Sequence, residues 1–106
     1  MANNFDEKSL TISNANLTDV YTASNKTIVI GGVMTNTSTS AINVTLKKYD
    51  NSGTATFPVY TTMPLPSGSA LKIEKLVLNT SDKVQAQSDH ASGNLTVTLN
   101  LLTDVA

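Results

Sequence analysis

Apolar and polar residues alternate along two long segments of this chain, 41–49 and 94–102. The apolar positions are Ile42, Val44 and Leu46 in the first segment and Leu95, Val97, Leu99 and Leu101 in the second. Successive side chains of a β-strand point to opposite faces, so this period predicts strands with one buried and one exposed face. No segment shows a helical period over ten residues. The chain is therefore predicted to be all-β.

Turn signals separate the predicted strands. Asp50-Asn51-Ser52-Gly53 and Pro64-Leu65-Pro66-Ser67-Gly68 combine residues that favour turns, because Pro fixes its own φ, Gly reaches positive φ, and Asn, Asp and Ser bond nearby backbone. We expect strands at 10–13, 17–22, 26–36, 41–49, 54–62, 69–73, 76–78, 83–88 and 94–102. Seven to nine short strands with turns about every 8 to 12 residues predict a single antiparallel β-sandwich, of jelly-roll or immunoglobulin-like type.

Two of the predicted strands carry unusual residues. Segment 26–36 contains the continuous apolar run Ile28-Val29-Ile30, which indicates burial on both faces, followed by Gly31-Gly32, which indicates a bulge or a sharp bend. Pro58 lies inside segment 54–62, and proline cannot donate a hydrogen bond to a neighbouring strand. We therefore expect that strand at the edge of a sheet or bulged there.

The chain of 106 residues is expected to form one domain. Its start is polar and irregular, so we expect an N-terminal arm over 1–9 and the sandwich over 10–106. The start has no basic region followed by an apolar run, and no stretch approaches the roughly 20 apolar residues of a membrane span. We expect neither a signal peptide nor a membrane partner.

Composition excludes several classes of function. The chain has no Cys and one His, which leaves too few ligands for a zinc site. That His90 lies in a predicted exposed loop, and no nucleophile motif accompanies it. The net charge is −1 with seven Lys and no Arg, so no nucleic-acid partner is expected. We predict that the chain is not an enzyme and has no catalytic residues, metal or cofactor.

A set of turn and strand motifs points to a family. The segments are Tyr21-Thr22, Lys26-Thr27-Ile28-Val29-Ile30, Thr35-Asn36-Thr37-Ser38, Ile42-Asn43-Val44-Thr45-Leu46, Met63-Pro64-Leu65-Pro66-Ser67-Gly68-Ser69-Ala70-Leu71, Lys75-Leu76-Val77-Leu78 and Ser81-Asp82-Lys83-Val84-Gln85. In this order they resemble small virion proteins of tailed bacteriophages, over roughly residues 20–102. The chain departs from that pattern at Ser24-Asn25, where Pro-Ala-Gly is usual, and at Ser81, where Gly is usual. Both departures affect turns.

The resemblance implies a non-enzymatic structural protein located in a bacteriophage virion and made in the host cytoplasm. The first prediction is a capsid decoration (cement) protein that binds across capsomers, with the major capsid protein or other virion proteins as partners. A neck, collar or tail accessory subunit is the alternative within the same class. A homo-oligomer is expected, with a trimer as the hypothesis, since decoration sites often lie on three-fold axes.

The candidate interface residues are Phe5, Phe57, Pro58 and Tyr60. Phe5 is the only large apolar residue of the polar arm and could anchor it to a partner, although it could also pack on its own domain. The other three would form an exposed edge, although packing within the domain is the alternative for Phe57 and Tyr60. A carbohydrate-binding or host-adhesion module is the alternative from another class, with Tyr21, Tyr49 and Tyr60 as the available aromatic residues.

Overall fold

The computed structural model describes residues 3–12, 15–89 and 95–105. Within these ranges the chain forms nine strands and no helix, so no helix there could cross a membrane. The strands are β1 (Asn4–Ile12), β2 (Thr18–Thr22), β3 (Thr27–Asn36), β4 (Ile42–Asp50), β5 (Ala55–Leu65), β6 (Ala70–Ile73), β7 (Leu76–Leu78), β8 (Lys83–Ser88) and β9 (Leu95–Thr103). The prediction of an all-β chain is confirmed.

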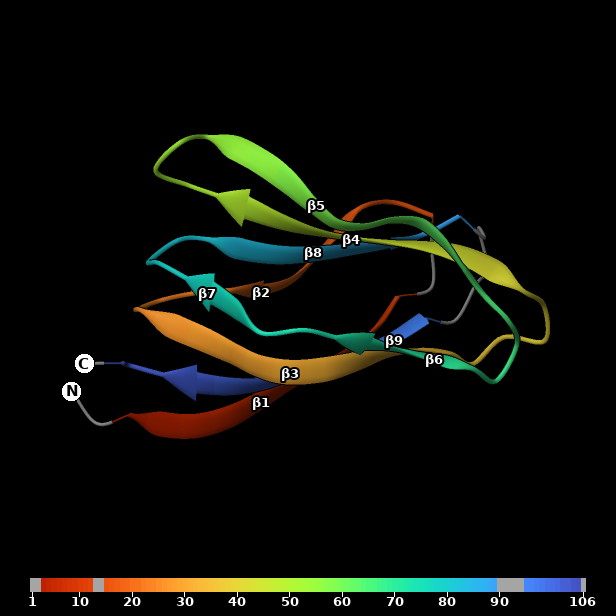
Figure 1. The fold of residues 1–106 in the computed structure, drawn as a ribbon, viewed down its shortest axis with the longest axis horizontal. Coiled ribbons are helices and arrows are strands. Elements are labelled where there is room, and N and C mark those ends of the chain that lie inside the picture. Colours follow the sequence, from red (N-terminus) through yellow and green to blue (C-terminus); the bar gives the residue numbers. More distant parts are fainter. Residues whose placement is uncertain (1–2, 13–14, 90–94, 106) are drawn as a thin grey trace.

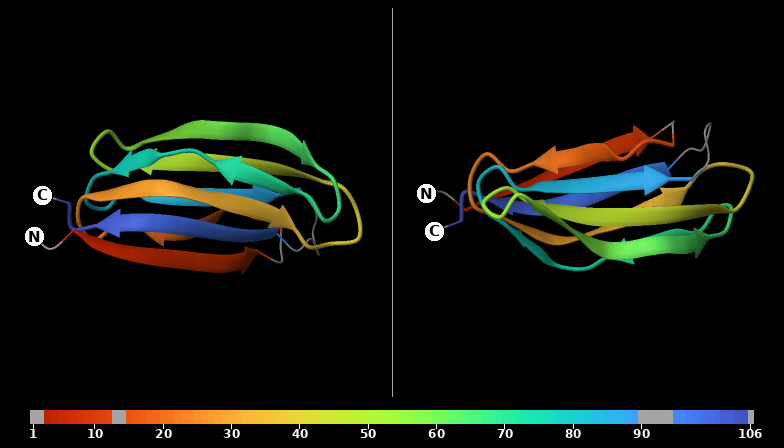
Figure 2. Two further views of the ribbon diagram at one scale, coloured as in Figure 1. Left: turned by 60° about the horizontal axis from the view of Figure 1, so that its bottom comes forward. Right: turned by 90° about the horizontal axis from the view of Figure 1, so that it is seen from above.

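The strands form two antiparallel sheets that face each other (Figure 1). The first sheet has the order β1-β9-β3, and β3 then pairs with β7 along Thr27–Val29 and with β6 along Gly32–Thr35. The second sheet has the order β2-β8-β4-β5. The predicted single antiparallel sandwich is confirmed, with the strand count at the upper end of the expected range. Figure 2 shows the two layers from further sides.

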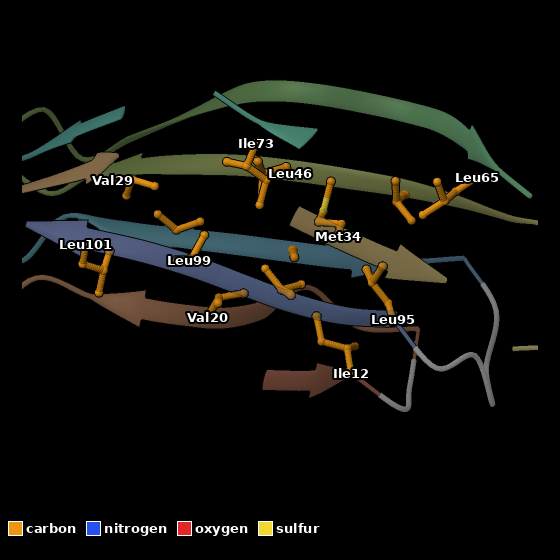
Figure 3. Packing of buried hydrophobic residues seen from close by; sticks show 14 of the residues in the cluster. Ile12, Val20, Val29, Met34, Leu46, Leu65, Ile73, Leu95, Leu99 and Leu101 are labelled. Atoms are coloured by element: carbon orange, nitrogen blue, oxygen red, sulfur yellow. The ribbon is translucent and has the colours of Figure 1, made fainter. Parts of the chain in front are cut away.

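The core lies between the two sheets and follows the alternation in the sequence. All seven apolar positions of 41–49 and 94–102 named above are buried, and Val29, Met34 and Ile73 complete the middle of the core (Figure 3). Burial of such side chains stabilises a fold by about 1.5–3 kcal/mol each. On β4 and β9 the face opposite the core carries mostly polar residues, as the period of two requires.

β3 contains the predicted bulge. Its register with β9 shifts between Val29 and Gly31, which confirms the interpretation of the glycine pair. The prediction that Ile28-Val29-Ile30 is buried on both faces is wrong, because Val29 is buried but Ile30 remains 46% exposed. The reason is that the second sheet covers one face of the first sheet, and none of the strands within residues 3–12, 15–89 and 95–105 covers the other.

The expected arm is, from Asn4 onward, a strand. β1 begins at Asn4 and pairs with β9 along its whole length, from Asn4 opposite Thr103 to Ile12 opposite Leu95. The boundary expected between residues 9 and 10 therefore falls inside a strand. Backbone pairing at a sheet edge needs no apolar side chains, and residues 4–9 are all exposed. This explains why a polar sequence forms a strand here.

β5 lies at the edge of the second sheet, where Pro58 was expected to place it. Its register with β4 shifts twice, on both sides of Leu46, so the strand is also bulged. Thr62 lies in one of these irregular stretches with a φ of 49°, and its N–H donates to Thr45 Oγ1 at 3.2 Å. The bulges and the proline make β5 a poor template for pairing with another strand.

Replacing Ser81 with glycine should stabilise the fold by about 0.5 kcal/mol. Ser81 has a φ of 73° in the turn before β8, and its N–H donates to the Ala23 carbonyl oxygen at 2.7 Å. A side chain in this left-handed region costs about 1 kcal/mol, which exceeds the entropy that glycine adds to the unfolded chain. Urea denaturation would measure the gain. Thr80→Gly is the matched control: Thr80 has no positive φ, so this variant should lose stability. Equal losses of stability in both variants would contradict the prediction.

Candidate interface surfaces

The described residues contain no group of three His, Cys, Asp or Glu side chains that could hold a metal ion. His90 lies outside the described residues. The buried Asp82 has a structural role, because its carboxylate accepts the backbone N–H groups of Asn51 at 3.0 Å and of Asn79 at 2.9 Å. It thereby joins the turn after β4 to the turn after β7.

The exposed Asp19 and the partly exposed Asp50 are held in their ionised form by local hydrogen bonds. The pKa of Asp19 is held below its ordinary value mainly by a hydrogen bond that Gln85 Nε2 donates at 2.8 Å. The Lys83 ammonium, 3.3 Å from the Asp19 carboxylate, lowers this pKa further. The Ser52 hydroxyl, with backbone N–H groups of the same turn, lowers the pKa of Asp50. Both acids are therefore ionised at neutral pH and unsuited to donate a proton.

The first surface is a line of apolar side chains across the outer face of the first sheet. Phe5 on β1 is opposite Leu102 on β9, Leu102 is opposite Ile28 on β3, and Ile28 is opposite Val77 on β7. Directly opposed residues on neighbouring strands point to the same face. We call these four residues the apolar row. Phe5 is 81% exposed and Val77 is 47% exposed, so the ends of the row are open to solvent.

A hollow of about 440 Å³ adjoins the row. It is shallow and open, and it is lined by Phe5, Asp6, Glu7, Ile30, Asn100 and Leu101. Ile30 extends the apolar surface along β3 from the row. A broad and shallow hollow of this kind suits contact with another surface better than enclosure of a small molecule, since ligand pockets bury most of their ligand.

The second surface is the edge formed by β5, and the structure separates the three residues expected there. Phe57 is 54% exposed and lies opposite Lys48, while Pro58 is exposed and lies opposite Lys47, so the two point to opposite faces of the sheet. Tyr60 packs against the core, and its hydroxyl donates to the Lys72 carbonyl oxygen at 2.8 Å. Tyr60 thus joins β5 to β6 in the other sheet. Phe5 lies on a different sheet from all three.

The tyrosines do not form an aromatic platform. Tyr21 and Tyr60 pack against the core, and the Lys83 ammonium lies 5.7 Å from the centroid of the Tyr49 ring. A second hollow of about 200 Å³ lies elsewhere, lined by Asn43, Thr45, Thr62, Gln87 and Asp89. The Asp89 carboxylate there already accepts the backbone and side-chain N–H groups of Asn43, each at 2.9 Å. The polar groups that line this second hollow bond mainly to one another.

Sequence reasoning found Phe5 but missed its companions in the apolar row. Ile28, Val77 and Leu102 are far apart in the chain, and only the strand register brings them side by side. One signal was present in the sequence. The continuous apolar run at 28–30 indicated apolar residues on both faces of β3. Those on the outer face, Ile28 and Ile30, are the ones that the second sheet does not cover.

Comparison with known proteins shows a shared fold. No family model and no curated protein sequence matches the chain. A solved chain from Bacillus endospore appendages, described as a novel family of disulfide-linked pili, is 15% identical with a TM-score of 0.58, over 100% of this chain and 96% of that one. A chain of infectious bursal disease virus, Gt strain, is 15% identical with a TM-score of 0.50, over 92% of this chain and 31% of that one.

A pentameric capsid protein isolated from metagenomic phage sequences is also similar, with 16% identity and a TM-score of 0.48, over 92% of this chain and 61% of that one. The chain spans less than two thirds of both viral chains but nearly all of the pilus chain. At 15% identity, the likeness to the pilus chain and to the bursal disease virus chain is one of fold.

Proposed function

We propose that this protein is a non-enzymatic structural subunit of an assembled particle, and specifically a capsid decoration (cement) protein of a tailed bacteriophage. The observation that carries the proposal is the apolar row, because the sandwich leaves a line of large apolar side chains on the outer face of the first sheet, with Phe5 and Val77 exposed at its ends. Contiguous apolar surface on a soluble domain marks contact sites for other proteins. The motif resemblance to phage virion proteins and the sandwich shared with a viral chain support the choice of particle.

The strand order adds support. The sheets β1-β9-β3-β6/β7 and β2-β8-β4-β5 place the last strand between the first and the third, and β4–β5 is the only directly paired hairpin of consecutive strands in the part of the chain that the structure describes. An immunoglobulin-like domain pairs its first two strands in one sheet, whereas here β1 and β2 lie in different sheets. We infer a jelly roll, an arrangement common in viral capsid domains.

A decoration protein would stabilise the shell by mass action. It would bind the assembled lattice and not the free capsid subunits, so that its binding free energy adds to the stability of the lattice. Neither an enclosed pocket nor a reactive group is required for this role. A sheet face and exposed side chains at its edge, such as Phe5 and Phe57, are sufficient.

Co-sedimentation with virions of the source phage tests the proposal. We expect the purified chain to pellet with particles in hundreds of copies, as a lattice of repeated sites requires. About a dozen copies or fewer would place it at the neck, collar or tail instead. Virions of an unrelated phage are the control. Absence of binding would overturn the virion proposal. A glycan screen would then test the carbohydrate-binding alternative, which the positions of Tyr21, Tyr49 and Tyr60 do not favour.

A subunit of a homopolymeric fibre is a second candidate. The likeness to a pilus subunit extends over nearly the whole of both chains, which favours it. The disulfide links of those pili cannot be shared, because this chain has no Cys. Negative-stain electron microscopy of the concentrated chain distinguishes the candidates, since filaments would support the fibre and dispersed particles the decoration protein.

A further inference from the structure

The edge strand β1 changes character between Ser9 and Leu10 (Figure 1). Its residues 4–9 are all exposed, whereas Leu10 packs against the core and Ile12 is buried. Both of these apolar residues lie opposite buried residues of β9, so they hold the end of β1 in the sandwich. The part of the strand before Leu10 has no such anchor in the core.

Charged side chains occupy core-side positions in that exposed part. Asp6 lies opposite Leu101, and Lys8 lies opposite Leu99. Both leucines are buried, and directly opposed residues point to the same face, so Asp6 and Lys8 point to the core side. Both charged residues nevertheless remain exposed at the edge of the sheet. Positions where apolar side chains could have held the strand therefore contribute no apolar burial.

The side-chain bonds along this part of β1 are also exposed. Ser9 Oγ lies 3.2 Å from Thr98 Oγ1. At the start of the strand, the Thr103 hydroxyl donates to the Asn4 carbonyl oxygen at 3.2 Å. Water competes for exposed groups of this kind, so such bonds add little to the stability of the pairing. The backbone bonds to β9 are left as the main attachment.

Those backbone bonds come from alternate residues of β1. The Glu7 N–H donates to Asp6 Oδ1 at 2.8 Å, so it points away from β9. The pairing of β1 with β9 has no register shift, and bonded and non-bonded pairs alternate in an antiparallel ladder. The even-numbered residues of β1 therefore bond to β9, and the odd-numbered residues direct their backbone groups to the free edge.

The same alternation divides the backbone groups of β9 between its two neighbours. Leu99 and Leu101 lie opposite even-numbered residues of β1, so their backbone groups bond to β1. The Thr98 carbonyl oxygen is directed at β3 instead, since a Cβ atom at Gly32 would lie 2.3 Å from it. Neighbouring amides of one central strand thus depend on different partners.

We propose that residues 4–9 of β1 form a strap that opens and closes on β9 while the rest of the sandwich stays folded, with Leu10 and Ile12 as its fixed end. The bond from the Asn3 N–H to the Asp104 carbonyl oxygen, at 3.2 Å, opens with it. Closing the strap orders its backbone at an entropic cost comparable to what its hydrogen bonds return, and no buried side chain adds to that return. Few buried apolar contacts and solvent-exposed backbone bonds mark a segment that opens locally.

The strap gives the first sheet two states. In the closed state, Phe5 lies beside Leu102 and completes the apolar row. In the open state, the row ends at Leu102, and the backbone groups of Leu99 and Leu101 lie at a new edge of the sheet. A partner that contacts Phe5 therefore selects the closed state. The opening is a property of the chain itself, and only this effect on binding rests on the proposed capsid contact.

Amide hydrogen exchange, followed by NMR on the purified chain, tests the strap residue by residue. After correction for intrinsic rates, we expect the amides of Leu99 and Leu101 to exchange at least ten-fold faster than the amide of Thr98. Val97 is the second control, because it lies opposite Leu10 and its amide should stay as protected as that of Thr98. Equal protection of all four amides would overturn the proposal. Exchange at Val97 as fast as at Leu99 would overturn the fixed end.

An engineered disulfide tests whether opening of the strap causes that exchange, in a chain that has no Cys of its own. Glu7 and Asn100 are exposed and lie opposite each other as a non-bonded pair, whose Cα atoms are about 4.5 Å apart, within the range of a disulfide. Oxidation of the variant Glu7→Cys/Asn100→Cys should slow exchange at Leu99 and Leu101 at least ten-fold and leave Thr98 unchanged. The reduced form of the same variant is the control.

The same exchange rates in the oxidised and reduced forms would overturn the strap. Denaturation of both forms verifies that the two substitutions leave the sandwich folded. Neither test involves particles, so failure of the strap is distinguishable from failure of virion binding.

Discussion

Replacing Gly32 with alanine should lower the free energy of unfolding by about 3 kcal/mol. A Cβ atom at Gly32 would lie 2.3 Å from the Thr98 carbonyl oxygen and 3.3 Å from the Leu99 Cα atom, both backbone atoms of β9. β9 is paired on both sides, with β1 and β3, so it cannot move away without disturbing two ladders. Overpacking costs about 1–3 kcal/mol, and a clash with backbone belongs at the upper end. For a domain with a stability of about 5–15 kcal/mol, such a loss is severe.

The neighbouring glycine provides the control. A Cβ atom at Gly31 would meet only the Ile73 carbonyl oxygen at 3.7 Å, an ordinary contact. Gly31→Ala should therefore change stability by less than about 1 kcal/mol. Urea denaturation of both variants, followed by circular dichroism, measures the difference. Similar stability of the two variants would mean that β9 yields more readily than its pairing indicates.

Replacing Asn36 with aspartate should destabilise the fold by about 3–5 kcal/mol at neutral pH. Asn36 is buried at the end of β3, where its Nδ2 donates to the carbonyl oxygens of Ser40 at 2.8 Å and of Leu65 at 2.9 Å. Its Oδ1 accepts from the Ser38 N–H at 2.9 Å and from the Ser38 hydroxyl at 2.6 Å. Aspartate would keep the acceptor but turn a carboxylate oxygen toward two carbonyl oxygens. A buried charge that lacks a partner costs several kcal/mol.

The pH dependence identifies the cause of that loss. In the variant the buried carboxyl group should be raised in pKa above its unfolded value of about 3.9, because the fold favours the neutral form. The ionisation penalty is then absent below about pH 3.9, grows as pH rises from there to the folded pKa, and is constant above it. Denaturation at pH 3.5 and pH 7 should show a smaller deficit, relative to the unmodified chain, at the lower pH. Asn100→Asp, at an exposed position of β9, should show little deficit at either pH.

The sequence predicts the parts of the fold that depend on side-chain period and turn chemistry. The buried positions of β9 follow from alternation, the bulge in β3 from its two glycines, and the edge position of β5 from Pro58. The N-terminal half of β1 was not predicted, because a polar edge strand carries no apolar signal and is formed by backbone pairing with a distant segment. For the same reason the apolar row could not be predicted. Phe5 stands out in the sequence as an apolar residue among polar ones, but the residues beside it in the row are set by the strand register.

The position of β9 between β1 and β3 also governs the order in which the protein can fold during synthesis. β1 and β3 have no partner between them in the first sheet until β9 has been made, almost the whole chain later. Until then β3 can pair on one side only, with β6 and β7, and the edge that β9 will occupy stays unpaired as the ribosome extends the chain. Non-local pairing of this kind makes folding slow and exposes nascent chains to aggregation. Expression yield should therefore depend more on temperature and chaperones than the stability of the finished domain would indicate.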